Sequence, residues 1–159
     1  MTKPGVDRVA MDKVRVKVRK KAGWEDLDLP RYLTPGSAGM DIMAAVEEGV
    51  VIAPGEIKFI PAGIYVALPA GFEIQLRPRS GLALKKGLGI VNSPGTIDSD
   101  YRGEVGVIMI NHGKEPVVIT RGMRMAQMVV QRVVRVDWRE VEELDATSRG
   151  AGGFGHSGH

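Results

Sequence analysis

The stretch Phe72-Glu73-Ile74-Gln75-Leu76-Arg77 decides the fold class, because apolar and polar residues alternate strictly along it. A period of two places the apolar side chains on one face of a β-strand and the polar side chains on the other. Residues 14–19 alternate in the same way, with three valines between three basic residues. Both stretches therefore predict half-buried β-strands.

Further apolar stretches predict strands elsewhere, at residues 57–60, 63–68, 105–110, 117–119 and 123–130. Turn-forming residues separate many of them, at Pro35-Gly36, Pro54-Gly55, Pro69-Ala70-Gly71, Pro94-Gly95 and Asn111-His112-Gly113. Many short strands at this spacing predict an all-β sandwich or barrel. Residues 80–87 differ, because Ser80 as an N-cap and Gly87 as a stop predict one short helix. Residues 138–144 fit either a second helix or an irregular connector.

Length and composition narrow the class of protein. The chain has 159 residues with 21 glycines and 5% aromatic residues, which predicts one domain with many turns and an aliphatic core. The absence of cysteine excludes a disulfide framework, a Cys-based zinc site and a thiol nucleophile, and is compatible with a reducing cytosol. No apolar run approaches the ~20 residues of a membrane span, and the N-terminus lacks the apolar segment of a signal peptide. We therefore expect a cytoplasmic protein.

The net charge of +3 has a local origin. The first 21 residues contain eight basic residues against Asp7 and Asp12, namely Lys3, Arg8, Lys13, Arg15, Lys17, Arg19, Lys20 and Lys21. A basic patch attracts nucleic acid or nucleotide phosphates, but a solvated strand face is the more common explanation. No aromatic platform for bases accompanies these charges, so we do not expect a nucleic-acid partner.

Polar, glycine-bearing segments interrupt the strands at residues 37–41, 77–81, 92–103 and 122–128. In the first, Asp41 precedes apolar Ile42 and either presents a carboxylate at the start of a strand or forms a turn. In the second, Arg77, Arg79 and Ser80 stand at the start of the short helix. Free N–H groups and guanidiniums there bind phosphate well, although an ordinary cap with solvated arginines explains the same residues.

The other two segments also have two interpretations each. Asn92 can read a base edge with its donor and acceptor, and Asp98 can take a proton from water, yet a polar hairpin needs the same residue types. Gln127 stands among apolar neighbours, where a buried amide needs partners, while the methionines around it are typical core residues.

The last thirteen residues, 147–159, contain five glycines and cannot build a core. They fit either simple disorder or a segment that becomes ordered over a ligand. His156 and His159 alone do not predict zinc, since a zinc site needs three or four ligands. Mg²⁺ remains possible, because it needs only one or two carboxylates beside substrate phosphates.

The four segments and the tail, in this order, resemble the five motifs of the trimeric dUTP pyrophosphatases, or dUTPases; the matching residues are 38–42, 79–83, 95–103, 122–127 and 149–155. The resemblance implies a jelly-roll-like β-barrel with one short helix, a flexible glycine-rich C-terminal arm and a homotrimer with active sites at subunit interfaces. It divides the chain into an N-terminal extension (1–12), a barrel domain (13–146) and an arm that closes over an active site (147–159).

The reaction implied by the resemblance is hydrolysis of dUTP to dUMP and pyrophosphate with Mg²⁺. This hydrolysis would limit uracil incorporation into DNA and supply dUMP for dTTP synthesis. The family pattern makes Asp98 the base that deprotonates the attacking water, and Asp41 a residue that holds Mg²⁺ through water. The implied substrate-binding residues are Arg79, Ser80, Gly81, Asn92, Gly95, Thr96, Ile97, Tyr101, Gln127, Arg149, Phe154, Gly155 and Ser157.

The implied roles divide these residues by the part of the nucleotide they contact. Asn92 and the adjoining hairpin backbone read the uracil edge, Tyr101 packs under the deoxyribose, and Phe154 stacks on the uracil. Arg79, Ser80, Gly81 and Gln127 bind the phosphates. Arg149 and Ser157 contact the terminal phosphate. Within this scheme His156 departs from the family, whose tail usually reads Gly-Phe-Gly-Ser-Thr-Gly.

Two other functions compete with this interpretation. The dCTP deaminases share the fold but usually carry a pocket Glu; Glu104 is the nearest one here and is poorly placed. A regulatory module would keep the nucleotide pocket without turnover, but every catalytic position of the family is present. The sequence therefore favours a dUTP hydrolase.

Overall fold

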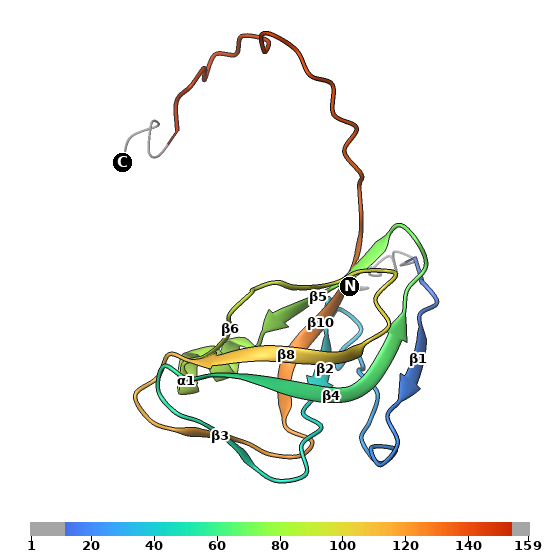
Figure 1. Cartoon of the computed structure of the whole chain (residues 1–159), viewed down its shortest axis with the longest axis vertical. Helices are drawn as coiled ribbons and strands as arrows, with labels where there is room; N and C mark the ends of the chain where they lie inside the picture. Colours follow the sequence, from blue (N-terminus) through green and yellow to red (C-terminus); the bar gives the residue numbers. More distant parts are fainter. Residues whose placement is uncertain (1–11, 154–159) are drawn as a thin grey trace, which may run out of the picture.

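The computed structural model describes residues 12–153 of the chain, which contain ten strands and one helix (Figure 1). The strands are β1 (Lys17–Lys20), β2 (Met40–Met43), β3 (Val50–Ile52), β4 (Ile57–Ala67), β5 (Phe72–Pro78), β6 (Leu88–Ile90), β7 (Gly95–Ile97), β8 (Glu104–Asn111), β9 (Val117–Ile119) and β10 (Arg124–Arg132). The helix α1 (Ser80–Lys86) lies between β5 and β6. The expected all-β class with one short helix is confirmed.

The strands form three antiparallel sheets around one core. One sheet has the order β1-β4-β8-β6, the second has the order β2-β10-β5-β7, and β3 pairs with β9. Among the described residues, no continuous ring of hydrogen bonds closes these sheets into a barrel. The jelly-roll-like barrel expected from the sequence is therefore present as facing sheets.

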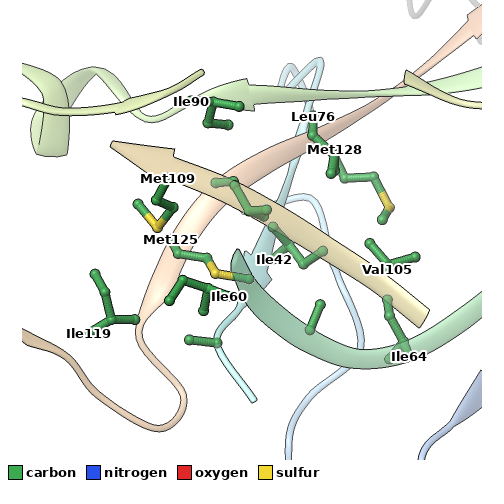
Figure 2. Packing of buried hydrophobic residues seen from close by; sticks show 14 of the residues in the cluster. Ile42, Ile60, Ile64, Leu76, Ile90, Val105, Met109, Ile119, Met125 and Met128 are labelled. Carbon is green, nitrogen blue, oxygen red and sulfur yellow. The ribbon is translucent and has the colours of Figure 1, made fainter. Parts of the chain in front are cut away.

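The core lies between the two four-stranded sheets and is almost entirely aliphatic (Figure 2). Ile74 and Leu76 of β5 are buried in it, while Gln75 and Arg77 lie on the opposite face of the strand, as the alternation predicts. Met125 and Met128 of β10 are also buried there. The prediction that methionines fill the core is confirmed for these two residues.

Several strands differ from their predicted bounds. The stretches 57–60 and 63–68 belong mainly to one long strand, β4, whose register against β8 shifts between Pro61 and Tyr65. Gly63 lies inside this irregularity with a φ of +65°, a left-handed conformation that glycine adopts without steric cost. The strand predicted at residues 14–19 is also displaced, because β1 begins only at Lys17. Val18, which the alternation places on the buried face, is 43% exposed.

The helix begins one residue earlier than its predicted cap implies. The N-cap is Arg79, which has extended backbone angles and makes no capping hydrogen bond with its side chain. Ser80 is the first helical residue, so its assignment as N-cap is wrong. The predicted stop at Gly87 is confirmed, because Gly87 has a φ of +68° and ends the helix in the left-handed conformation.

Residues 133–153 leave the sheets as an extended segment (Figure 1). They contain no helix or strand, so the helical alternative for residues 138–144 is wrong and the irregular connector is correct. Val134, Trp138 and Leu144 are exposed. Among residues 12–153 no helix is long and apolar enough to cross a membrane.

Candidate active site

Side chains from two other parts of the chain contact a buried carboxylate, that of Asp41 on β2. It is 5% exposed, and its Oδ2 lies 3.1 Å from Nη1 of Arg124. Its Oδ1 lies 3.4 Å from Nε of Arg79 and accepts a 3.5 Å hydrogen bond from Nε2 of Gln127. Burying a carboxylate costs free energy unless it is paired, and here three donors surround it. The polar segments at 37–41, 77–81 and 122–128 therefore meet at one place.

The strand register explains why these residues meet. Asp41 pairs directly with Gln127 across the β2–β10 ladder, and Gln127 pairs with Arg77 across the β10–β5 ladder. Directly paired residues of an antiparallel sheet present their side chains on the same face. β5 then leads into Arg79, whose Nη1 donates a 2.7 Å hydrogen bond to the carbonyl oxygen of Arg124. This bond fixes the Arg79 guanidinium beside Asp41.

The start of α1 adds backbone donors to this cluster. The first N–H groups of a helix have no partner within it, and Ser80 and Gly81 are both exposed. Together with Arg79 and Arg124 they form an edge of positive charge. Such an edge can receive phosphate oxygens through N–H groups and planar guanidiniums. Arg124 was not among the predicted site residues, although its charge within the apolar stretch 123–130 was a usable signal.

A second group of predicted residues lines a cleft of about 120 Å³ beside the loop that connects β6 to β7; Asn92, Gly95, Thr96, Ile97 and Tyr101 are all in its wall. β6 and β7 pair with different strands, so the polar hairpin considered for this segment is not formed, and the term hairpin cleft denotes only the space that these residues line. A Cβ atom added to Gly95 would lie 3.5 Å from Nδ2 of Asn92, so the Asn92 amide packs against the β7 backbone. The amide and the β7 backbone thus face a common narrow space.

Tyr101 closes the turn that follows β7. Its N–H donates a 3.2 Å hydrogen bond to the carbonyl oxygen of Asp98, and its hydroxyl donates a 3.0 Å hydrogen bond to the carbonyl oxygen of Glu104. A Cβ atom at Gly103 would overlap the tyrosine ring, which therefore lies directly over that glycine. These contacts hold the ring at the wall of the hairpin cleft.

Asp98 lies in a different cleft of the same chain. It follows Ile97 at the end of β7, and successive residues of a strand point to opposite faces, so Ile97 is buried while Asp98 is exposed. Its cleft, of about 370 Å³, is also lined by Glu73, Asp100 and Arg135. The structure thus places the predicted base in a different cleft from Asn92.

The arm residues are separate from both clefts. Arg149 lies in the extended segment, where its Nε donates a 2.7 Å hydrogen bond to the carbonyl oxygen of Gly152. Phe154, Gly155 and Ser157, and also His156, lie outside the described residues. Within one chain, the predicted site residues that the structure describes therefore lie in four separate places, namely the Asp41 cluster, the cleft at Asn92, the cleft at Asp98 and the arm, and no single cavity joins them.

No cluster of three or more His, Asp or Glu side chains suited to a metal ion occurs within residues 12–153. Asp41 does not fit as a direct metal ligand, because cationic groups already contact both of its oxygens. A carboxylate in this position fits the water shell of a metal better than the metal itself. The residues present are thus compatible with Mg²⁺ held mainly by substrate phosphates.

Comparison with known proteins identifies relatives along almost the whole chain. The family model named dUTPase matches residues 25–158. The deoxyuridine 5'-triphosphate nucleotidohydrolase of Thermoanaerobacter sp. (strain X514) is 55% identical over 143 residues, which cover 90% of this chain and 97% of that protein. The enzyme of the same name from Maricaulis maris (strain MCS10) is 54% identical over 150 residues, covering 93% and 99%.

Solved structures give the same result for the fold. A Staphylococcus bacteriophage 80alpha dUTPase variant with dUpNHpp matches with a TM-score of 0.77 and 26% identity, covering 91% of this chain and 99% of that chain. A dUTPase variant from phage phi11 of S. aureus, described with a structural Mg(II) ion, matches with a TM-score of 0.73 and 25% identity, covering 83% and 99%. Since the family model spans most of the sequence and the relatives are more than half identical over it, this chain belongs to the dUTPase family.

Proposed function

We propose that this protein is a dUTP diphosphatase, which hydrolyses dUTP to dUMP and pyrophosphate. The observation that carries the proposal is the short segment around β7, in which Asn92 lines a narrow cleft before the strand and Asp98 follows directly after it. One short element thus offers groups for reading a base and a carboxylate for activating water. The names of the related enzymes support the same activity.

Selection of uracil would occur in the hairpin cleft. The Asn92 amide has both a donor and an acceptor, and the backbone of Gly95 and Thr96 lies beside it. A cleft this narrow would exclude the 5-methyl group of thymine sterically. Cytosine would leave mismatched polar groups, each of which costs about 1–3 kcal/mol when buried. Tyr101, at the cleft wall, would pack under the deoxyribose and exclude a 2′-hydroxyl.

The triphosphate would bind at the positive edge beside Asp41. Arg79 supplies a guanidinium, Ser80 and Gly81 supply helix N–H groups, and Gln127 supplies an amide donor. These donors are in place before the reaction, and fixed donors stabilise the charge that develops on phosphoryl oxygens. Asp98 would orient the water and take its proton as it attacks the α-phosphorus.

Mg²⁺ is the metal we propose for this site. When bound, it neutralises charge on the triphosphate and orients it. Asp41 would accept hydrogen bonds from the water around the metal, because its oxygens lie among donors and not in an open ligand position. Removal of Mg²⁺ with a chelator is expected to abolish hydrolysis, and its addition is expected to restore it.

We propose that the working enzyme is a homotrimer with shared active sites, a soluble cytoplasmic protein that binds neither nucleic acid nor membrane. The separation of Asp98, Arg79 and Arg149 within one chain supports sites built from several copies. The arm, residues 147–159 beyond a barrel domain of residues 13–146, would close over the nucleotide through Arg149, Phe154, Gly155 and Ser157. The N-terminal extension, residues 1–12, has no role in this scheme.

The test is release of pyrophosphate from dUTP, dTTP, dCTP and UTP in the presence of Mg²⁺. We expect rapid release from dUTP and almost none from the other three nucleotides. Ammonia release from dCTP would instead identify a deaminase, and nucleotide binding without any turnover would identify a regulatory module. Sedimentation of the purified protein would show whether it assembles as a trimer.

A further inference from the structure

Phe59 is an aromatic residue of β4 that lines the hairpin cleft together with Asn92 and Tyr101. It was not singled out by the sequence, because residues 57–60 indicate only a short strand there. In the isolated chain Phe59 is 59% exposed. Burying a phenylalanine side chain contributes roughly 1.5–3 kcal/mol, so this ring offers apolar surface that a bound nucleoside can cover.

The position of the ring is determined by a glycine on the neighbouring strand. A Cβ atom at Gly106 would overlap the Phe59 ring, which therefore occupies the space that any side chain at position 106 would fill. β4 pairs with β8 at this point, with Phe59 opposite Ile108 and Pro61 opposite Gly106. A glycine within a strand commonly marks such a close approach. The ring is thus placed by the sheet and not by a mobile loop.

A second aromatic residue, Tyr101, shows the same arrangement just before β8. The Tyr101 ring lies over Gly103 just as the Phe59 ring lies over Gly106, and both rings belong to the lining of the hairpin cleft. Asn92 supplies the polar group of this cleft. Hydrogen bonds to a base are stronger where water is excluded, and two aromatic rings at the cleft wall would provide that exclusion.

We propose that Phe59 is a nucleoside-binding residue, whose ring forms an apolar wall of the uracil and deoxyribose site. This inference rests on the proposed function. The wall contacts the nucleoside equally in the substrate and in the transition state, because the bond that breaks lies at the phosphates. Interactions of this kind affect KM and leave kcat nearly unchanged.

The experiment compares Phe59→Ala with Ile57→Ala. Ile57 is the matched control, because it lies two residues earlier on the same face of β4, is similarly exposed at 52%, and does not line the cleft. Steady-state hydrolysis of dUTP gives KM and kcat, and calorimetric titration with dUMP gives a Kd. We expect Phe59→Ala to raise KM and the dUMP Kd by about tenfold, the order of effect of lost apolar contact in a pocket, and Ile57→Ala to change neither.

Two further variants sharpen the result. Phe59→Leu retains apolar volume and is expected to recover part of the affinity. Gly106→Ala displaces the ring without removing it, and we expect it to raise KM as Phe59→Ala does. Equal KM values for Phe59→Ala and Ile57→Ala, in an enzyme that hydrolyses dUTP, would contradict the proposed nucleoside-binding role of Phe59. The proposed function would be unaffected.

The remaining outcomes separate the two proposals. If the unmodified protein does not hydrolyse dUTP but binds dUMP, and Phe59→Ala weakens that binding, the activity is rejected and the wall is supported. If Phe59→Ala instead changes sedimentation of the protein and loses activity with it, Phe59 belongs to a subunit interface and the wall is overturned.

Discussion

The carboxylate of Asp41 lies 3.1 Å from the guanidinium of Arg124, a residue 83 positions away in the sequence. Asp41 is almost fully buried, whereas the Arg124 side chain is 46% exposed. In this ion pair, a buried carboxylate holds a guanidinium that is still partly exposed to solvent. A cation held in this way is oriented before any phosphate arrives, and it keeps donors free to meet one.

Replacing Asp41 by Asn tests this relationship. The variant removes the charge that faces Arg79 and Arg124, and leaves two guanidiniums near each other without their counterion. We expect the free energy of unfolding to fall by about 1–3 kcal/mol, the usual cost of leaving buried polar groups poorly paired, and dUTP hydrolysis to fall with it. Urea unfolding and a pyrophosphate assay measure the two effects.

The matched control is Asp28→Asn. Asp28 and Arg31 form an exposed ion pair with an oxygen–nitrogen distance of 3.7 Å, and exposed pairs contribute about 0–1 kcal/mol. We expect little change in stability and none in activity. A loss in Asp28→Asn as large as that in Asp41→Asn would show that burial of the carboxylate is not what makes the Asp41 cluster important.

The parts of the fold that could be predicted are those with enough residues to show a period. The alternation over 72–77 locates β5 to within one residue of its bounds. The strands β3, β6 and β7 each have three residues, too few to show a period of two, and none was predicted. β9 is equally short and was predicted only as a run of three apolar residues, a signal that β3 shares and that therefore does not decide between strand and loop. The helix start was misplaced by one residue because the extended backbone of Arg79, and not the Ser80 side chain, forms the cap.

The candidate site could be predicted only as a set of residue types. Asp41 alone fits a turn as well as a buried carboxylate, and the choice depends on Arg124 and Gln127, which the strand register brings beside it. The sequence likewise does not show that Asp98 and Ile97 face different clefts. Phe59 was missed because its role depends on a missing side chain at Gly106 on another strand.

Asp98→Asn is expected to bind nucleotide normally and to lose turnover. The amide keeps the size of the side chain but cannot accept a proton, and loss of a general base typically slows a reaction about 10²–10⁴-fold. Single-turnover hydrolysis of dUTP measures the effect, and titration with dUMP checks binding. Asp100→Asn is the control, since Asp100 lines the same cleft and is expected to retain activity. If Asp98→Asn retains the turnover of the unmodified protein, Asp98 is not the general base.

Gly63→Ala is expected to destabilise the fold more than Gly71→Ala. Both glycines have positive φ angles, +65° and +82°, so each substitution places an L-residue in a conformation that costs roughly 1–2 kcal/mol. Only at Gly63 would the new Cβ also approach a neighbour closely, at 2.9 Å from the Cβ of Ala45. Thermal unfolding of both variants measures the difference. Equal melting temperatures would show that β4 relaxes to accommodate the methyl group.

Truncation after Ser148 is expected to slow dUTP hydrolysis far more than it lowers the melting temperature. Residues 149–153 form no helix or strand, and within residues 12–153 the Arg149 side chain donates its hydrogen bond to Gly152 of the same segment. Their removal therefore takes little packing from the sheets, whereas a lid that excludes water from a bound nucleotide affects the reaction itself. Arg149→Ala in the full-length chain is the companion variant, expected to reduce hydrolysis less than truncation does. Equal losses of activity and thermal stability on truncation would show that the arm has a structural role.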